Sequence, residues 1–414
     1  MTNALTWVFL CALAAATALR LWLAARQIRH VRAHRDAVPE PFAEAIPLDA
    51  HRRAADYSVA KTRLGAAEAI AGAAALVVLT LGGLLEALAR AWAEWLDPGG
   101  LAHGLALIVS LVALLSALEL PFSIWRVFVI EQRFGFNRMT PRLFAADLVR
   151  QAAVGAALGV PLVALVLWLM QAAGERWWLW AWLAWAAFNV LLLAAWPTLI
   201  APLFNRFSPL ADPALAARVK TLLERCGFRA GGLYVMDGSR RSSHGNAYFT
   251  GFGAAKRVVL FDTLLQRLAP AEVEAVLAHE LGHYRRRHVL QRVALLLLAS
   301  FGMFWLLGRV MHEEWFYAGL GVHTRTHATA LALFFLVAPV FTFFLQPLAS
   351  LVSRRHEFEA DAYAAAHSSA QDLVRALVKL YRDNAATLTP DPLHSVFYDS
   401  HPPAAARIAR LRTP

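Results

Sequence analysis

The pattern of hydrophobic and polar positions divides the chain into long apolar runs separated by polar segments. Seven runs approach the roughly 20 residues that an α-helix needs to cross the hydrocarbon core of a membrane. They occupy residues 5–25, 66–88, 105–124, 152–170, 177–199, 293–311 and 328–350. We therefore predict seven membrane-spanning helices. The first run has no basic residue before it and is longer than the apolar part of a signal peptide, so we expect an uncleaved anchor.

Basic side chains are concentrated in some of the loops between these runs. Residues 26–65 contain a long series of arginines and one lysine, whereas the loops on the other side contain few basic residues. Lys and Arg mark cytoplasmic loops because they resist translocation. We therefore expect loops 26–65 and 125–151 to be cytoplasmic, with the N-terminus outside and the C-terminus inside.

Two polar segments, residues 201–292 and 353–414, are too long to be simple loops. The first contains short runs of β-forming residues at 233–236, 247–252 and 257–261, which predict a small sheet. We divide the chain into four parts. These are residues 1–200 with the first five spans, a cytoplasmic segment 201–292, residues 293–352 with the last two spans, and a cytoplasmic C-terminal segment 353–414.

The composition agrees with a membrane protein and excludes several other classes. Of 414 residues, 58% are hydrophobic and only 17% are charged, which is too apolar for an ordinary soluble fold. The net charge of +11 follows from the basic cytoplasmic loops and contact with anionic lipids, so we expect no nucleic-acid partner. The two cysteines, Cys11 and Cys226, exclude a disulfide scaffold and a cysteine-rich zinc module.

The main chemical motif lies on a helix predicted after residue 269. It is His279-Glu280-Leu281-Gly282-His283, an HExxH sequence. Histidines four residues apart share one helix face, so both imidazoles can reach a single zinc ion. The glutamate beside them can take a proton from bound water. We expect His279 and His283 to bind one zinc ion per chain and Glu280 to act as the general base.

A catalytic zinc needs a third protein ligand and an open position. The HExxH helix leads into the sixth span, and the seventh span returns the chain to the same side at residues 353–361. The two ends of such a helical hairpin lie side by side. Glu357 and Asp361 share a helix face there, being four residues apart. We expect one of them to bind the metal and the other to orient a ligand or to transfer protons.

Three neighbouring residues are weaker candidates for the metal site. Glu359 lies on roughly the opposite side of its helix from Glu357, so we expect it to be solvated. His356 is turned about 100° away from Glu357 around the helix. His288 follows the HExxH motif at a distance that makes it a poor ligand.

The sequence HELGH, followed by a spanning hairpin and SRRHEFEAD at residues 353–361, resembles the CAAX prenyl protease type 1 family of integral-membrane zinc metallopeptidases. The HtpX-like proteases are more distant and have fewer spans. Further blocks that resemble the family occupy residues 56–63, 129–137, 245–249, 257–264 and 400–403. His356 and Glu359 depart from the family pattern, which has an aromatic residue and a glutamine at these positions.

The resemblance implies a fold and a role for each site residue. It implies an α-helical integral membrane protein whose seven helices enclose a chamber, with a cytoplasmic zincin-like protease domain that contains a small β-sheet. It makes Glu357 the third zinc ligand and Asp361 a proton donor. Asn246 and His401 match positions that contact the substrate backbone and the reacting carbonyl. From the residues alone, Asn246 is also explained as a turn residue and His401 as an exposed histidine.

These observations favour a membrane-embedded zinc endopeptidase that cleaves peptides or membrane proteins, including prenylated CAAX-type sequences. A quality-control protease with no prenyl requirement remains an alternative. A transporter or channel with structural zinc, or a silent scaffold, would also explain polar residues inside the spans. These residues are Arg20, Glu68, Glu86, Glu119, Asn189 and Gln346. We expect a bacterial inner membrane, with the endoplasmic reticulum as the alternative, and an active site on the cytoplasmic side.

Overall fold

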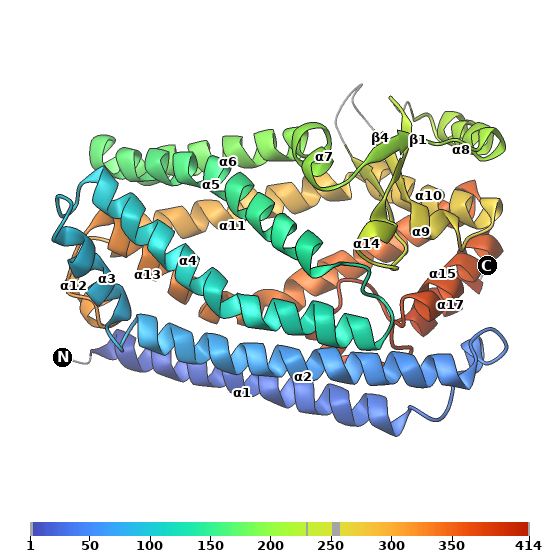
Figure 1. Ribbon diagram of the computed structural model, residues 1–414, viewed down its shortest axis with the longest axis horizontal. Coiled ribbons are helices and arrows are strands. Elements are labelled where there is room, and N and C mark those ends of the chain that lie inside the picture. The colour runs from blue at the N-terminus through green and yellow to red at the C-terminus, as the bar shows by residue number, and fades with distance from the viewer. Residues whose placement is uncertain (1–2, 229–230, 251–256, 413–414) are drawn as a thin grey trace.

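Long helices dominate the computed structural model, which describes residues 3–228, 231–250 and 257–412 (Figure 1). Within these described residues, seven helical stretches are long and apolar enough to cross a membrane, as the sequence predicts. Their bounds are Ala4–Ala33, Leu48–Leu79, Leu101–Glu131, Pro141–Ala172, Gly174–Phe204, His288–Val310 and His327–His367. The chain is therefore a multi-pass integral membrane protein.

Most of these helices extend beyond the apolar runs. Helix α1 (Ala4–Ala33) and helix α2 (Leu48–Leu79) absorb much of the segment 26–65 that the sequence suggested as a loop. The predicted span 66–88 is wrong at its end, because α2 stops at Leu79 and a separate helix α3 (Leu84–Ala93) follows. Thr80, at the end of α2, has ψ of −96°, and Gly83, directly before α3, has φ of 76°, a left-handed conformation that suits glycine. The residues across this break are mostly apolar, so the hydrophobic pattern did not reveal it.

Three of the five remaining spans are built from several helical pieces, and the other two are single α-helices. Two contain π-helical turns, at Arg126–Glu131 and Trp196–Ile200. Their α-helical elements are α4 (Leu101–Trp125), α5 (Pro141–Ala172), α6 (Trp177–Ala195), α7 (Ala201–Phe204), α11 (His288–Val310), α13 (His327–Thr342) and α14 (Gln346–His367). A short helix α12 (Glu314–Ala318) connects α11 to α13 at the end of the bundle that also holds the N-terminus and α3 (Figure 1).

A small sheet lies at the opposite end of the bundle (Figure 1). Its strands are β1 (Phe207–Pro209), β2 (Leu233–Met236), β3 (Ala247–Thr250) and β4 (Arg257–Phe261), in the order β1-β2-β4-β3. Strands β2 and β4 are parallel, and β3 pairs with β4 in antiparallel fashion. Strand β3 is therefore an edge strand. The predicted strands are confirmed where the structure describes them, and residues 251–252 of the run 247–252 lie outside the described residues.

Helices surround the sheet and complete this end of the molecule. They are α8 (Pro213–Arg225), α9 (Asp262–Leu265), α10 (Pro270–Arg285), α15 (Ala370–Asp383), α16 (Pro392–Tyr398) and α17 (Ala404–Arg412). Leu222, Leu260 and Leu277, from α8, β4 and α10, are fully buried in one hydrophobic core. This core packs one face of α10 against the sheet. The opposite face of α10 therefore points away from the sheet.

Helix α10 approaches α14 very closely at Gly282. A Cβ atom at this position would lie 2.9 Å from the Cα atom of Ala360 and 3.1 Å from its carbonyl oxygen. Only glycine fits such a backbone contact without a shift of one helix. The close packing brings the face of α10 that carries the HExxH histidines against the face of α14 that carries Glu357.

A cavity of about 1030 Å³ runs between α1, α2 and α13 and reaches the segment 384–404. It agrees with the chamber that the family resemblance implies. Arg20 and Glu68, two of the polar residues inside the predicted spans, line it. Glu119 instead lies 3.6 Å from the Arg126 guanidinium, and the Asn189 amide donates to the carbonyl of Trp185 in its own helix. The polar intramembrane residues therefore have mixed roles.

Candidate metal centre

Helix α10 presents the two motif histidines toward α14. The helix begins at Pro270, and the Glu272 carboxylate accepts hydrogen bonds from the Ala269 amide at 2.7 Å and from the Lys379 ammonium at 2.7 Å. This cap fixes the start of α10 and ties it to α15. His279 is 7% exposed and lies one turn before His283. The rigid helix therefore sets the spacing of the two imidazoles before any metal binds.

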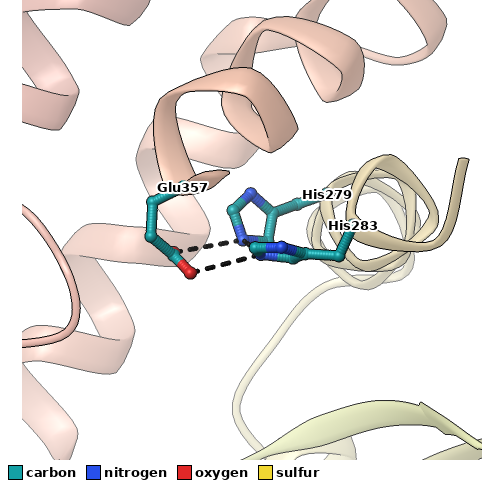
Figure 2. Close-up of side chains that lie close together, drawn as sticks. All are labelled: His279, His283 and Glu357. Carbon is teal, nitrogen blue, oxygen red and sulfur yellow. Dashed lines mark hydrogen bonds and ion pairs between the residues drawn. The ribbon is translucent and has the colours of Figure 1, made fainter. Parts of the chain in front are cut away.

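The structure brings His279, His283 and Glu357 together (Figure 2). The Nε2 atoms of the two histidines are 3.2 Å apart. The carboxylate oxygens of Glu357 lie 3.2 Å from His283 Nε2 and 3.5 Å from His279 Nε2. Glu357 is only 2% exposed. Of the two acidic candidates on this helix face, Glu357 therefore faces both histidines.

This arrangement fits a tetrahedral zinc ion. Ligand atoms bound to zinc at 2.0–2.1 Å in a tetrahedron are about 3.3 Å from one another. The two imidazole Nε2 atoms are 3.2 Å apart, and the two oxygens of the Glu357 carboxylate lie 3.2 Å from His283 and 3.5 Å from His279. The buried Oε2 atom of Glu357 accepts no hydrogen bond in the described part of the chain. A buried carboxylate oxygen without a hydrogen bond is costly, and a cation beside the two histidines would compensate its charge.

Asp361 lies behind His279 and does not face the metal position. Its Oδ1 atom is 2.9 Å from His279 Nδ1. The Arg407 guanidinium on α17 donates two hydrogen bonds, of 2.6 and 2.8 Å, to the same carboxylate. Asp361 thus holds the imidazole ring, and Arg407 holds Asp361. The sequence analysis missed Arg407 because no motif marks it and its partner lies far away in the chain.

A second set of contacts orients His283. Its Nδ1 atom is 3.0 Å from His288 Nδ1, and His288 Nε2 is 3.2 Å from a carboxylate oxygen of Glu359. The His356 ring stacks on His288, with centroids 4.0 Å apart and planes at 9°. His288 and His356 therefore lie behind the metal position, and Glu359 is held by His288 and Arg355 rather than simply solvated.

The charges around the centre shift several pKa values. Burial by itself would lower the pKa of His279, but hydrogen bonds with Asp361 and Glu357 outweigh it and raise that pKa to about 9. Burial raises the pKa of Glu280, and the neighbouring histidines oppose the rise. Desolvation opposes ionisation of Arg407, yet the hydrogen bonds to Asp361 raise its pKa above the usual value. Arg407 is therefore a permanent positive charge behind the site.

Asn246 and His401 both line the cavity between the membrane helices. His401 follows α16, and its Nε2 atom is 3.5 Å from a carboxylate oxygen of Glu357. Desolvation lowers the pKa of His401, although Glu357 opposes this effect. Asn246 is exposed and directly precedes the edge strand β3.

One further side chain, Asn384, was missed by the sequence analysis. Its amide accepts from the Gly245 N–H at 3.1 Å and donates to the Gly245 carbonyl at 3.4 Å. Asn384 thereby ties the end of α15 to the residue before Asn246. An asparagine at the end of a helix has many ordinary explanations, so the sequence carried no signal for this contact.

Comparison with known proteins identifies the family. Residues 27–206 match a family model described as CAAX prenyl protease N-terminal, five membrane helices. Residues 209–414 match the model of peptidase family M48. The chain belongs to family M48. It is therefore a membrane metalloendopeptidase, which decides against the transporter, channel and scaffold hypotheses.

Relatives within family M48 share most of the chain. CAAX prenyl protease 1 homolog of Arabidopsis thaliana is 36% identical over 76% of this chain and 75% of its own. CAAX prenyl protease 1 of Saccharomyces cerevisiae is 34% identical over 75% of this chain and 72% of its own. The crystal structure of S. mikatae Ste24p matches the whole of both chains with a TM-score of 0.92 and 28% identity.

Proposed function

We propose that this M48 peptidase is a zinc enzyme that binds its metal with His279, His283 and Glu357 and cleaves peptides beside the cavity between its membrane helices. The convergence of these three ligands on one point beside the cavity supports the proposal most directly. Bound zinc would supply a Lewis acid and lower the pKa of a water molecule toward neutrality. One zinc ion per chain satisfies the three ligands.

Other residues of this chain supply the base, the hydrogen-bond donor and the positioning groups of the reaction. Glu280, next to His279, takes a proton from the attacking water as the general base. His401 donates a hydrogen bond to the oxygen of the reacting carbonyl as negative charge develops there. The Ser400 hydroxyl lies 2.9 Å from His401 Nδ1, and when it donates to Nδ1 the ring proton is on Nε2, the atom that faces Glu357. For Asp361, the contacts with His279 and Arg407 support a positioning role rather than proton donation.

Strand β3 supports a mode of substrate binding. It is the edge of the sheet, so its outer backbone groups are available to an extended peptide. Such a peptide would add to the sheet as a further strand. Asn246, at the beginning of β3, would hold the peptide main chain near the metal.

The mechanism predicts a clean separation between zinc binding and catalysis. Glu280→Gln removes the base but no zinc ligand, so peptide cleavage should fall by at least a hundredfold while zinc remains bound at one ion per chain. Mass spectrometry measures peptide cleavage, and metal analysis measures the amount of bound zinc. Glu224→Gln, on the outside of α8, is the matched control and should keep full activity. Normal turnover by Glu280→Gln would refute the proposed base.

The substrate class and the membrane are further parts of the proposal. The printed names of the relatives, CAAX prenyl protease 1, support peptides with a prenylated carboxyl-terminal sequence. Cleavage-site mapping on matched prenylated and unprenylated peptides tests this, and equal rates would favour the quality-control alternative. The basic segment 26–65 supports an active site on the cytoplasmic side. The alanine- and arginine-rich composition favours a bacterial inner membrane over the endoplasmic reticulum. Thiol labelling of cysteines placed at positions 36 and 97 of a cysteine-free variant would establish the orientation.

A further inference from the structure

The cavity contains a lysine whose charge the proposed mechanism does not use. Lys61, on α2, lines the cavity together with two other basic residues, Arg20 and Arg407. Arg407 is held by two hydrogen bonds to Asp361. The Arg20 guanidinium lies 4.1 Å over the ring of Phe343. These two contacts assign Arg407 to the metal site and Arg20 to helix packing.

Lys61 has no comparable partner. Its side chain is exposed, and its ammonium group lies 4.0 Å from the centre of the Tyr57 ring. Glu131 and Asp399 are the acidic groups that act on its charge, yet within the described residues neither forms an ion pair with Lys61. Glu131 instead accepts a hydrogen bond from the Tyr57 hydroxyl and lies 3.4 Å from His244 Nε2. The lysine therefore offers its positive charge to the cavity.

The contacts around Lys61 place it near the start of the edge strand. Tyr57, which supports the lysine, stacks against His244 with centroids 6.4 Å apart. His244 is two residues before Asn246, and Lys61 lines the same cavity as Asn246 and Asn384. The free ammonium thus lies at the end of the cavity where β3 begins.

The direction of a bound peptide follows from strand pairing. Antiparallel pairs are more stable per residue than parallel ones, so an added peptide would run opposite to β3. Its carboxyl-terminal part then leaves the sheet past Asn246, on the side of Lys61. An extended chain advances about 3.3 Å per residue, so three residues beyond the cleaved bond span about 10 Å. A carboxyl terminus a few residues past the cleaved bond would thus end in the part of the cavity that Lys61 lines.

We propose that Lys61 binds the terminal carboxylate of the substrate and so selects peptides that are cut a few residues before their end. This inference rests on the proposed peptidase function. An ammonium group on a flexible stem suits a small anion and provides three hydrogen-bond donors. An internal segment of a protein has no terminal carboxylate at this position.

The test uses two peptides that differ only in a free or an amidated carboxyl terminus. With the wild-type enzyme, kcat/KM should be roughly 10- to 100-fold higher for the free acid, as expected for a hydrogen bond to a charged group. In Lys61→Met the ratio of kcat/KM for the free acid to that for the amide should fall to near one. The fall should come from slower cleavage of the free acid, while kcat/KM for the amide stays unchanged. Lys61→Arg should retain most of the preference.

Two matched variants complete the design. Lys220→Met removes an exposed lysine on α8 and should leave the ratio unchanged. Arg20→Met removes the other cation without a carboxylate partner in the cavity and should also keep the preference. Equal wild-type rates for acid and amide, or a loss of preference in Arg20→Met instead of Lys61→Met, would overturn the assignment. Failure to cleave either peptide, even with zinc bound, would count against the peptidase proposal itself.

Discussion

At the scale of single residues, the two histidines of the HExxH motif are oriented in different ways. His279 contacts a carboxylate directly, because Asp361 lies 2.9 Å from its Nδ1 atom. His283 reaches a carboxylate only through a second histidine, His288. A ring whose Nε2 binds metal carries its proton on Nδ1, so His283 donates to His288, and His288 in turn donates from Nε2 to Glu359. Both arrangements fix the tautomer that zinc requires.

The relay behind His283 makes His288 a positioning residue. His288→Ala should weaken zinc binding by about 10- to 100-fold, the usual effect of losing such a partner. Glu359→Gln should have a smaller effect, since an amide oxygen can still accept from His288 Nε2. Chelator competition measures the affinity, and His34→Ala, an exposed histidine at the end of α1, is the control. Wild-type zinc affinity in His288→Ala would show that the relay does not support the metal.

At the scale of elements, the site depends on the packing of α10 against α14. His279 and His283 come from one helix and Glu357 from the other, and both helices leave directly into or out of membrane spans. The contact at Gly282 leaves no room for a side chain, since the nearest atoms belong to the backbone of Ala360. The separation of the two helices therefore determines the distance between the histidines and the glutamate.

This packing predicts an unusually strong effect of one methyl group. Gly282→Ala must push the two helices apart, so it should destabilise the protein by about 1–3 kcal/mol and also weaken zinc binding. Thermal unfolding and zinc titration measure both effects. Gly302→Ala, in the middle of α11 where nothing lies within 4 Å of the added atom, is the matched control. Unchanged zinc affinity in Gly282→Ala would mean that the helices tolerate a wider spacing.

At the scale of the whole molecule, Glu86 joins distant parts of the chain at the end opposite the sheet. Its carboxylate accepts hydrogen bonds from the backbone amides of His323 at 2.9 Å and Thr324 at 2.8 Å. Burial by itself would raise the pKa of Glu86, but these bonds and those from Arg90 and the Thr324 hydroxyl lower it to about 2. The charged carboxylate thus ties α3 to the segment before α13.

The lowered pKa has a defined consequence for stability. The unfolded chain binds a proton at Glu86 near pH 4.5, whereas the folded protein binds it only near pH 2. The stabilisation is therefore complete above about pH 4.5 and is lost as the pH falls toward 2. Wild type should melt at a higher temperature than Glu86→Gln at pH 7, and the gap should close over this range. A gap that stays constant with pH would contradict the ionised contact.

The sequence by itself determined the features that depend on near neighbours. Each span is a local excess of apolar residues, and the two histidines share a face because a helix repeats every 3.6 residues. The hairpin of the last two spans was enough to bring Glu357 into consideration. The sequence could not decide whether Glu357 or Asp361 binds the metal, because both lie on the same face of one helix.

Only the tertiary structure decided the features that depend on distant partners. Arg407 reaches Asp361 from 46 positions away, and Asn384 reaches Gly245 from 139 positions away. The edge position of β3 depends on the order of the described strands, and the break between α2 and α3 depends on backbone angles at Thr80 and Gly83. None of these is encoded in a short run of residues. They arise when helices and strands pack, and they orient the metal ligands and open the cavity beside them.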